Sequence, residues 1–194
     1  MKELATQSEL QKFNSQEKNP LKSLFVIAFR NFRDPEYFLP RELLAENGVE
    51  VKTASNKKGV AIGAEGGEVE VDFLVEEVNP KDFDAIIFVG GPGCLESLDN
   101  EKSYNLIQKT AELQKILGAI CIAPVILAKA GVLEGKKATV WSSAFDRSPI
   151  KILKENGAEF LDEKVVQDGK IITANGPEAA KEFGRKILEA LKGR

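Results

Sequence analysis

Cys121 is the residue of this sequence best placed for nucleophilic chemistry. It follows an apolar run that ends at Ile120 and precedes a second apolar run that opens with Pro124. A strand that turns sharply into a helix presents its corner side chain above a sheet, and the tight turn requires small residues two positions before and two positions after. Ala119 and Ala123 meet that requirement. The pattern predicts a nucleophile elbow with Cys121 at its corner.

The helix after this elbow is predicted to begin at Cys121 and to end at Gly131. Pro124 is compatible with a first helical turn, and glycine supplies a left-handed stop. Unpaired N–H groups and the helix dipole would then stabilise a thiolate, so we expect the pKa of Cys121 to lie below the ~8.5 of free cysteine. The alternative is a small core residue, because free cysteine is among the most buried residue types.

The absence of histidine from the sequence limits the possible mechanisms. A Cys-His or Ser-His-Asp relay needs an imidazole as its general base, and neither this chain nor a homo-oligomer of it can supply one. Zinc motifs built on histidine are excluded as well, and we expect no metal and no cofactor. Acid–base steps near neutral pH must therefore use a carboxyl group with a raised pKa, a thiol, a lysine or water.

Composition and charge favour one cytoplasmic domain. The 194 residues are 43% hydrophobic, which is enough to bury a full core. Two cysteines do not make a disulfide framework, so a reducing compartment is expected. A net charge of −3 without a basic stripe predicts neither a nucleic acid nor a membrane partner. The longest early apolar run, Leu24 to Phe29, is too short to span a bilayer.

Strands and helices alternate along the chain, which predicts a mostly parallel sheet with helices on both faces. Continuous apolar runs at Leu24 to Ala28, Ala85 to Val89 and Ile116 to Ile120 are typical of strands buried on both faces. The other elements expected in the main sheet and its layers are strands at Val49 to Ser55 and Ala138 to Trp141, and helices at Asp34 to Gly48 with Pro40 inside, Asn100 to Gln114, Ser148 to Gly157 and from Gly176-Pro177 onward.

Two β-hairpins and an N-terminal extension complete the predicted organisation. A hairpin around Gly66-Gly67, with one solvent-facing side, is expected to attach to the main sheet, and a late antiparallel hairpin turns at Asp168-Gly169. Residues 1–22 are polar. They are predicted to form either a short helix lined by three apolar side chains or a loosely docked extension, before one domain over residues 23–194.

Two further candidates follow the ends of predicted strands. Gly90-Gly91 comes directly after the strand at residues 85–89, and glycine there lets backbone N–H groups approach an anion closely. Open α/β sheets bind their ligands at this end of the strands. Glu36 lies in the first turn of the helix after the first strand. From the residues alone, Glu36 is a surface carboxylate that complements the helix dipole.

Together these motifs resemble the ThiJ/PfpI family, part of the class I glutamine amidotransferase-like superfamily. The resemblance covers Ser23 to Leu191 and is carried by Gly90-Gly91, the elbow from Ala119 to Pro124, and the Asp168-Gly169 hairpin with the Thr173-to-Pro177 segment after it. It implies a single-domain, flavodoxin-like doubly wound sheet with a side hairpin. It also implies a homodimer or a larger homo-oligomer.

The resemblance also implies roles for individual residues. In the family, an acidic residue four positions before a proline contacts the elbow cysteine, and Glu36 and Pro40 match this spacing. We therefore expect Glu36 to be partly buried, hydrogen-bonded to Cys121 and raised in pKa. By position, the oxyanion donors of the family correspond to the backbone N–H groups of Gly91 and Ile122.

Three positions depart from the family pattern. Ile122 stands where members classed as peptidases carry histidine, Trp141 where other members carry a histidine, and Asn175 where many carry an arginine. Trp141 and Asn175, together with Gly90, are expected to line the pocket. Cys94, three residues past Gly91, is interpreted as a buried packing residue, with a resolving thiol as the alternative.

Three functions remain open at this point. The first is a glyoxalase- or deglycase-like enzyme in which Cys121 adds to a small carbonyl substrate, Gly91 and Ile122 stabilise the oxyanion, and Glu36 moves the proton. The second is a redox-responsive protein or chaperone of the stress response, whose Cys121 is oxidised to a sulfinic acid next to Glu36. The third is an intracellular peptidase or amide hydrolase, which the missing histidine disfavours.

Overall fold

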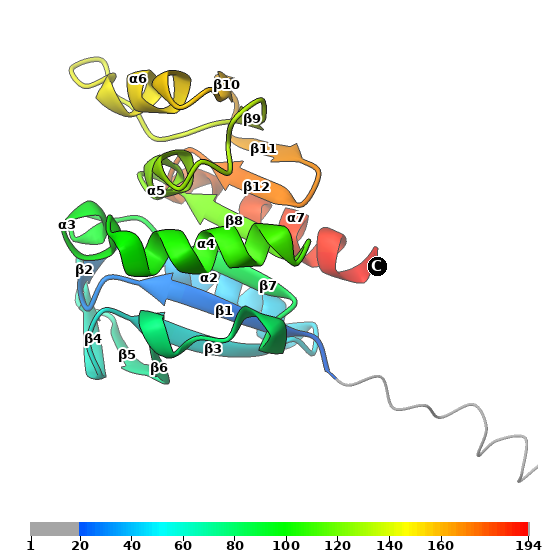
Figure 1. Ribbon diagram of the computed structural model, residues 1–194. Coiled ribbons are helices and arrows are strands. Elements are labelled where there is room, and N and C mark those ends of the chain that lie inside the picture. The colour runs from blue at the N-terminus through cyan, green and yellow to red at the C-terminus, as the bar shows by residue number, and fades with distance from the viewer. Residues whose placement is uncertain (1–19, 194) are drawn as a thin grey trace, which may run out of the picture.

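A seven-stranded sheet forms the centre of the computed structural model, which describes residues 20–193 (Figure 1). Its strands are β1 (Lys22–Ile27), β3 (Glu50–Ser55), β6 (Phe73–Leu74), β7 (Ala85–Phe88), β8 (Ile116–Ile120), β11 (Val165–Asp168) and β12 (Ile171–Ala174). They lie in the order β11-β12-β8-β7-β1-β3-β6, and every neighbouring pair is parallel except β11 with β12. The predicted mostly parallel α/β fold and the late hairpin are thus confirmed.

Helices cover both faces of this sheet. The α-helices are α2 (Asp34–Glu46), α3 (Cys94–Leu98), α4 (Glu101–Glu112), α5 (Pro124–Lys129), α6 (Ser148–Glu155) and α7 (Ala180–Lys192), and the short 3-10 turns are η1 (Val75–Glu77), η2 (Pro80–Asp82) and η3 (Pro177–Ala179). Figure 1 shows α4 in front of the sheet and α2 behind it. Helix α7 packs beside α2, and α6 lies against α5.

Alternate side chains of β1 divide the core into two halves. Leu24 and Val26 pack with the residues of α4 and α5, whereas Phe25 and Ile27 pack with those of α2 and α7. All four are fully buried, as the continuous apolar run predicts. Gly184 allows the close approach of α7 to α2, because a Cβ there would lie 2.9 Å from a backbone atom of Pro40.

The hairpin around Gly66-Gly67 forms as predicted, but it does not attach to the main sheet through strand pairing. Its strands, β4 (Gly59–Gly63) and β5 (Glu68–Val71), join β2 (Arg30–Phe32) in a separate three-stranded sheet. The reason is a left-handed residue, Asn31 with φ 59°, which redirects the chain after β1 so that β2 pairs with β4. The next strand along the chain, β6, pairs with β3 in the main sheet.

The strand predicted over Ala138 to Trp141 is shorter than expected. Strand β9 (Lys137–Ala138) pairs only with β10 (Glu159–Phe160). Beyond Ala138 the backbone leaves the strand ladder, because the N–H of Thr139 donates to Thr173 Oγ1 at 2.9 Å and the N–H of Trp141 donates to the carbonyl of Cys121 at 2.8 Å. This departure carries Trp141 to the end of β8.

The other predicted helices are present with small differences at their ends. Asn100 caps α4 by accepting hydrogen bonds from the N–H groups of Lys102 and Ser103. The turn η3 intervenes between Gly176 and α7. The predicted N-terminal extension lies outside the described residues except for its last few positions. No helix within residues 20–193 has the length and apolar character needed to cross a membrane.

Candidate active site

Cys121 occupies the corner between β8 and α5. Its backbone is left-handed, with φ 64°, a conformation that costs a non-glycine residue energy. Hydrogen bonds hold it on both sides, because its N–H donates to the carbonyl of Ala174 at 2.8 Å and its carbonyl accepts from Trp141. A residue with this φ cannot belong to a right-handed helix. The helix therefore begins at Pro124, and the prediction that it begins at Cys121 is wrong.

Gly90 lets the ends of three elements meet beside this corner. A Cβ at Gly90 would lie 2.5 Å from the Cβ of Cys121 and 2.7 Å from Oε2 of Glu36, closer than real contacts allow. Gly91 has φ 111°, and a Cβ there would lie 2.4 Å from the backbone nitrogen of Arg33. The two glycines thus allow the end of β7, the start of α2 and Cys121 to come together.

Glu36 lies in the first turn of α2 and is fully buried, more deeply than the partial burial we expected. Burial raises its pKa to about 7, although the Cys121 thiol, the Arg33 charge and the Gly90 backbone each act in the opposite direction. Neither carboxyl oxygen has a partner at full hydrogen-bond geometry among the described residues. The Cys121 thiol is nevertheless close enough to lower the pKa of Glu36, and the expected hydrogen bond between the two groups stays a prediction.

The electrostatics of Cys121 contradict the predicted low pKa. Burial, followed by the neighbouring charge of Glu36, raises the pKa of its thiol to about 12, although the N–H groups of Gly91 and Ile122 act in the opposite direction. The side chain is only 8% exposed and lies before the helix, so desolvation outweighs the N–H dipoles. As the pH rises, Glu36 therefore loses its proton before Cys121 does, and near neutral pH Cys121 is a thiol.

Asp34 is the first residue of α2, and its side chain bonds to a distant hairpin and not to the N–H groups of its own helix. Its carboxylate accepts hydrogen bonds from the N–H groups of Glu65 at 3.0 Å and Gly67 at 2.6 Å, in the turn of the β4–β5 hairpin. Glu65 returns a bond, since its carboxylate accepts from the N–H of Asp34 at 3.0 Å. The β4–β5 hairpin, which is distant from Glu36 along the chain, thereby fixes the position of the first residue of α2.

A cavity of about 290 Å³ opens beside the sulfur. It is lined by Arg33, Gly91, Pro92, Leu95, Cys121, Ile122 and Trp141. Trp141 is among these residues, whereas Gly90 lies beneath the lining, against Cys121. Asn175 is not among the lining residues, and its N–H donates instead to the carbonyl of Lys164 at 3.0 Å. Its expected place in the pocket is a further correction.

Arg33 is the charged residue of this cavity that the sequence analysis missed, along with the apolar residues Pro92 and Leu95. It immediately precedes the predicted helix and follows the first strand closely, so its place near the sheet edge could have been inferred. Arg33 is not part of any motif recognised in the sequence, so nothing connected its charge with the site. Cys94, by contrast, is a free cysteine that is fully buried at the start of α3, so the interpretation as a packing residue is confirmed.

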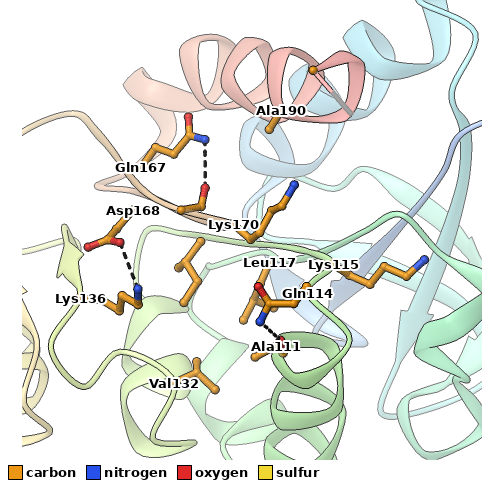
Figure 2. Close-up of a pocket in the computed structure, with 13 residues that line it drawn as sticks. Ala111, Gln114, Lys115, Leu117, Val132, Lys136, Gln167, Asp168, Lys170 and Ala190 are labelled. Carbon is orange, nitrogen blue, oxygen red and sulfur yellow. Dashed lines mark hydrogen bonds and ion pairs between the residues drawn. The ribbon is translucent and has the colours of Figure 1, made fainter.

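A larger cavity of about 640 Å³ lies at the opposite edge of the sheet (Figure 2). Leu117 and Ile171, near the starts of β8 and β12, contribute to it, and Lys115, Lys136 and Lys170 stand around it. Among the described residues that line it there is no cysteine, serine or threonine. Within residues 20–193, no group of three or more Cys, Asp or Glu side chains is arranged to hold a metal ion.

Comparison with known proteins matches the model of the DJ-1/PfpI family to residues 22–190. The chain is 36% identical over 172 residues to Deglycase PfpI of Pyrococcus furiosus, covering 89% of this chain and all of that protein. It is 28% identical to the glutathione-independent glyoxalase DJR-1.2 of Caenorhabditis elegans, over 88% of this chain and 89% of the relative. The crystal structure of a ThiJ/PfpI domain protein from Brachyspira murdochii superimposes with a TM-score of 0.83, at 32% identity and 89% and 97% coverage.

Proposed function

The chain belongs to the DJ-1/PfpI family, and from that premise we propose that it is an enzyme that acts on small reactive carbonyl compounds, with Cys121 as nucleophile and Glu36 as acid and base. The observation that supports this most is the buried carboxyl group of Glu36 beside the sulfur of Cys121, at the wall of a cavity of about 290 Å³. Relatives named as a deglycase and a glyoxalase point to the same class of substrate.

In the first step the sulfur of Cys121 attacks the carbonyl carbon. A C–S bond forms, the π electrons of the carbonyl move to its oxygen, and the thiol proton passes to Glu36 and then to that oxygen. The product is a hemithioacetal. A thiol with a pKa of about 12 is a poor nucleophile until its proton leaves, and a carboxylate with a pKa of about 7 is well matched to accept it near neutrality.

The developing oxyanion needs hydrogen-bond donors that are already in place. The N–H groups of Gly91 and Ile122 both interact with the sulfur of Cys121, so an oxygen on the carbon that binds this sulfur lies within their vicinity. For a 2-oxoaldehyde, the hemithioacetal C–H proton then moves to the adjacent carbon and its hydroxyl proton moves to the former ketone oxygen, which leaves a 2-hydroxy thioester. Water then hydrolyses the thioester to a 2-hydroxy acid and frees the thiol.

The test is turnover of methylglyoxal by the wild-type protein and by two variants. Glu36→Gln preserves size but cannot exchange protons, so a loss of at least ~100-fold is expected with the fold intact. Cys121→Ser is expected to lose activity as well. Cys94→Ala is the matched control, because Cys94 is buried in the core and does not line the cavity; it should retain turnover. Circular dichroism of all three variants separates loss of chemistry from loss of fold.

Other outcomes would support the alternatives. Wild-type protein without activity on 2-oxoaldehydes, but with Cys121 readily oxidised to a sulfinic acid in a Glu36-dependent way, would overturn the enzyme proposal in favour of a redox-responsive protein. Peptide cleavage that depends on Cys121 would overturn it in favour of a hydrolase. Mass spectrometry after mild peroxide and a fluorogenic peptide assay measure these two outcomes.

A further inference from the structure

We propose that Arg33 makes the Cys121 cavity selective for carbonyl compounds that carry a carboxylate next to the reacting carbonyl group. This inference rests on the proposed function and narrows its substrate class. Arg33 is the charged residue among those that line the cavity, and the other lining residues are uncharged apart from any ionisation of the thiol itself.

The backbone of Arg33 is fixed at the junction that also positions Glu36 and Cys121. Its N–H donates to the carbonyl of Gly90 at 3.1 Å, and its own carbonyl accepts from the N–H of Glu36 at 3.1 Å. The backbone of Gly91 packs so closely on it that no side chain fits between them. The backbone of Arg33 is therefore anchored three residues before Glu36, and Arg33 lines the same cavity as Cys121.

The guanidinium retains donors that the folded chain does not use. Nη1 donates to Oε1 of Glu65 at 2.6 Å, which employs one of its five N–H groups. Nε is buried and has no hydrogen-bond partner among the described residues. Because Nε is shielded from solvent, an anionic acceptor in the cavity would meet the Nη N–H groups that Glu65 does not use, and would gain a charge-assisted hydrogen bond from them.

The charge balance of the cavity favours an anion in spite of Glu65. The Arg33–Glu65 ion pair is open to solvent, with 37% and 42% of the two side chains exposed, so water screens the Glu65 charge. The hydrogen bond that Arg33 donates to Glu65 raises the pKa of Arg33, which stays charged. Glu36, whose pKa is about 7, does not line the cavity, so its carboxylate form makes no direct contact with an anion bound there. A substrate carboxylate therefore meets a positive wall.

Glyoxylate is the simplest compound of this class. Sγ of Cys121 bonds to its aldehyde carbon, the C=O π bond breaks, and the thiol proton passes through Glu36 to the new oxygen, so that nothing is oxidised or reduced. The carboxylate remains intact and pairs with Arg33. Glycolaldehyde has a similar size and the same aldehyde, but it is neutral and lacks the group that Arg33 would bind.

The test compares two alkylating reagents of nearly equal size, anionic iodoacetate and neutral iodoacetamide. We measure the rate of Cys121 modification by each, by peptide mass spectrometry, and take the ratio of the two rates. Arg33→Gln is expected to lower the iodoacetate-to-iodoacetamide ratio about tenfold, the size of one modest charge-assisted hydrogen bond. Glu65→Gln, which removes the competing carboxylate, should raise the ratio. Arg33→Lys, which retains the charge without the planar fork, should keep part of the preference.

Arg30→Gln is the matched control. Arg30 is an arginine on the neighbouring strand, its guanidinium lies 4.6 Å above the ring of Phe29, and it does not line the cavity. This variant should leave the ratio unchanged. In the same samples, glyoxylate should protect Cys121 from iodoacetamide at lower concentration than glycolaldehyde does, and Arg33→Gln should abolish that difference.

These outcomes separate this inference from the proposed function. An unchanged alkylation ratio in Arg33→Gln overturns the role of Arg33, whether or not the protein turns over methylglyoxal. A ratio that depends on Arg33, in a protein without any carbonyl turnover, supports the charge selectivity and counts only against the enzyme. If Arg33→Gln does not fold, the opposite shift expected in Glu65→Gln decides the question.

Discussion

The two edges of the central sheet carry cavities of opposite character. The cavity at the carboxyl ends of β7 and β8 measures about 290 Å³ and contains Cys121, whereas the one at the starts of β8 and β12 measures about 640 Å³ and is surrounded by lysines. The smaller cavity is lined by a buried thiol, and a fully buried acid, Glu36, lies next to that thiol without lining the cavity. The larger one has a carboxylate, Asp168, that is paired with Lys136 near solvent. Under the proposed function, the chemistry takes place at the smaller cavity, which is marked by its buried titratable groups and not by its volume.

The largest effect that distinguishes the two edges should appear in stability against pH. The pKa of Glu36 rises from 4.5 to about 7 on folding, so the folded state holds its proton more tightly than the unfolded state does. Stability is therefore highest below the unfolded pKa and falls as pH rises toward 7. At ~1.4 kcal/mol per pKa unit, the loss amounts to ~3 kcal/mol.

Glu36→Gln should remove this loss. The variant cannot ionise, so at pH 8 its free energy of unfolding is expected to exceed that of the wild type by ~3 kcal/mol, with little difference at pH 4. Urea unfolding at both pH values measures this. A variant that is equally or less stable than the wild type at pH 8 would show that Glu36 is not a strained buried acid.

A second effect concerns glycine at the two edges. Gly90→Ala places a Cβ 2.5 Å from that of Cys121, so the end of β7 or the cysteine must shift. Overpacking of this kind costs about 1–3 kcal/mol of the free energy of unfolding. Because it would also displace Cys121 and Glu36, we expect turnover to fall as well.

Gly169→Ala is the matched substitution at the opposite edge. Gly169 has φ 61°, and no atom lies within 4 Å of its added Cβ. The cost is therefore confined to the left-handed backbone, about 1–2 kcal/mol, and turnover should not change. Equal losses of turnover in the two glycine variants would show that Gly90 matters for stability alone.

The elements were predictable wherever one local rule decided them. Buried parallel strands show as apolar runs such as Leu24 to Ala28, and the late hairpin shows through Asp168-Gly169. The family resemblance then connected Glu36 with Cys121, two residues that are far apart in the chain. Local rules alone left Glu36 on the surface.

What the sequence did not reveal depends on contacts between distant segments. Asp34 is a good helix cap by its type, but the hairpin turn at Glu65 and Gly67 offers it better donors. The pKa of Cys121 depends on how deeply the corner is buried, which the residues around it do not encode. Arg33 belongs to no motif, and only the fold places it in the wall of the cavity.

The smallest effect should come from the carboxylate of the larger cavity, and its sign should be opposite to that of Glu36. Asp168 accepts a hydrogen bond from the N–H of Lys137 at 3.0 Å and pairs with Lys136 at 3.3 Å. The Lys137 N–H, followed by the lysine charges, lowers the pKa of this exposed group. Its contribution is therefore present above the unfolded pKa and disappears as pH falls through the folded pKa.

Asp168→Asn should accordingly cost at most about 1 kcal/mol at neutral pH, because solvent screens the pair, and nothing once the pH has fallen below the folded pKa of Asp168. Turnover of methylglyoxal should stay at the wild-type level, since Asp168 lies at the opposite edge from Cys121. The same urea titrations used for Glu36→Gln measure the effect. If Asp168→Asn instead reduced turnover while leaving stability unchanged, the two edges would be coupled, and the larger cavity would have a part in the function after all.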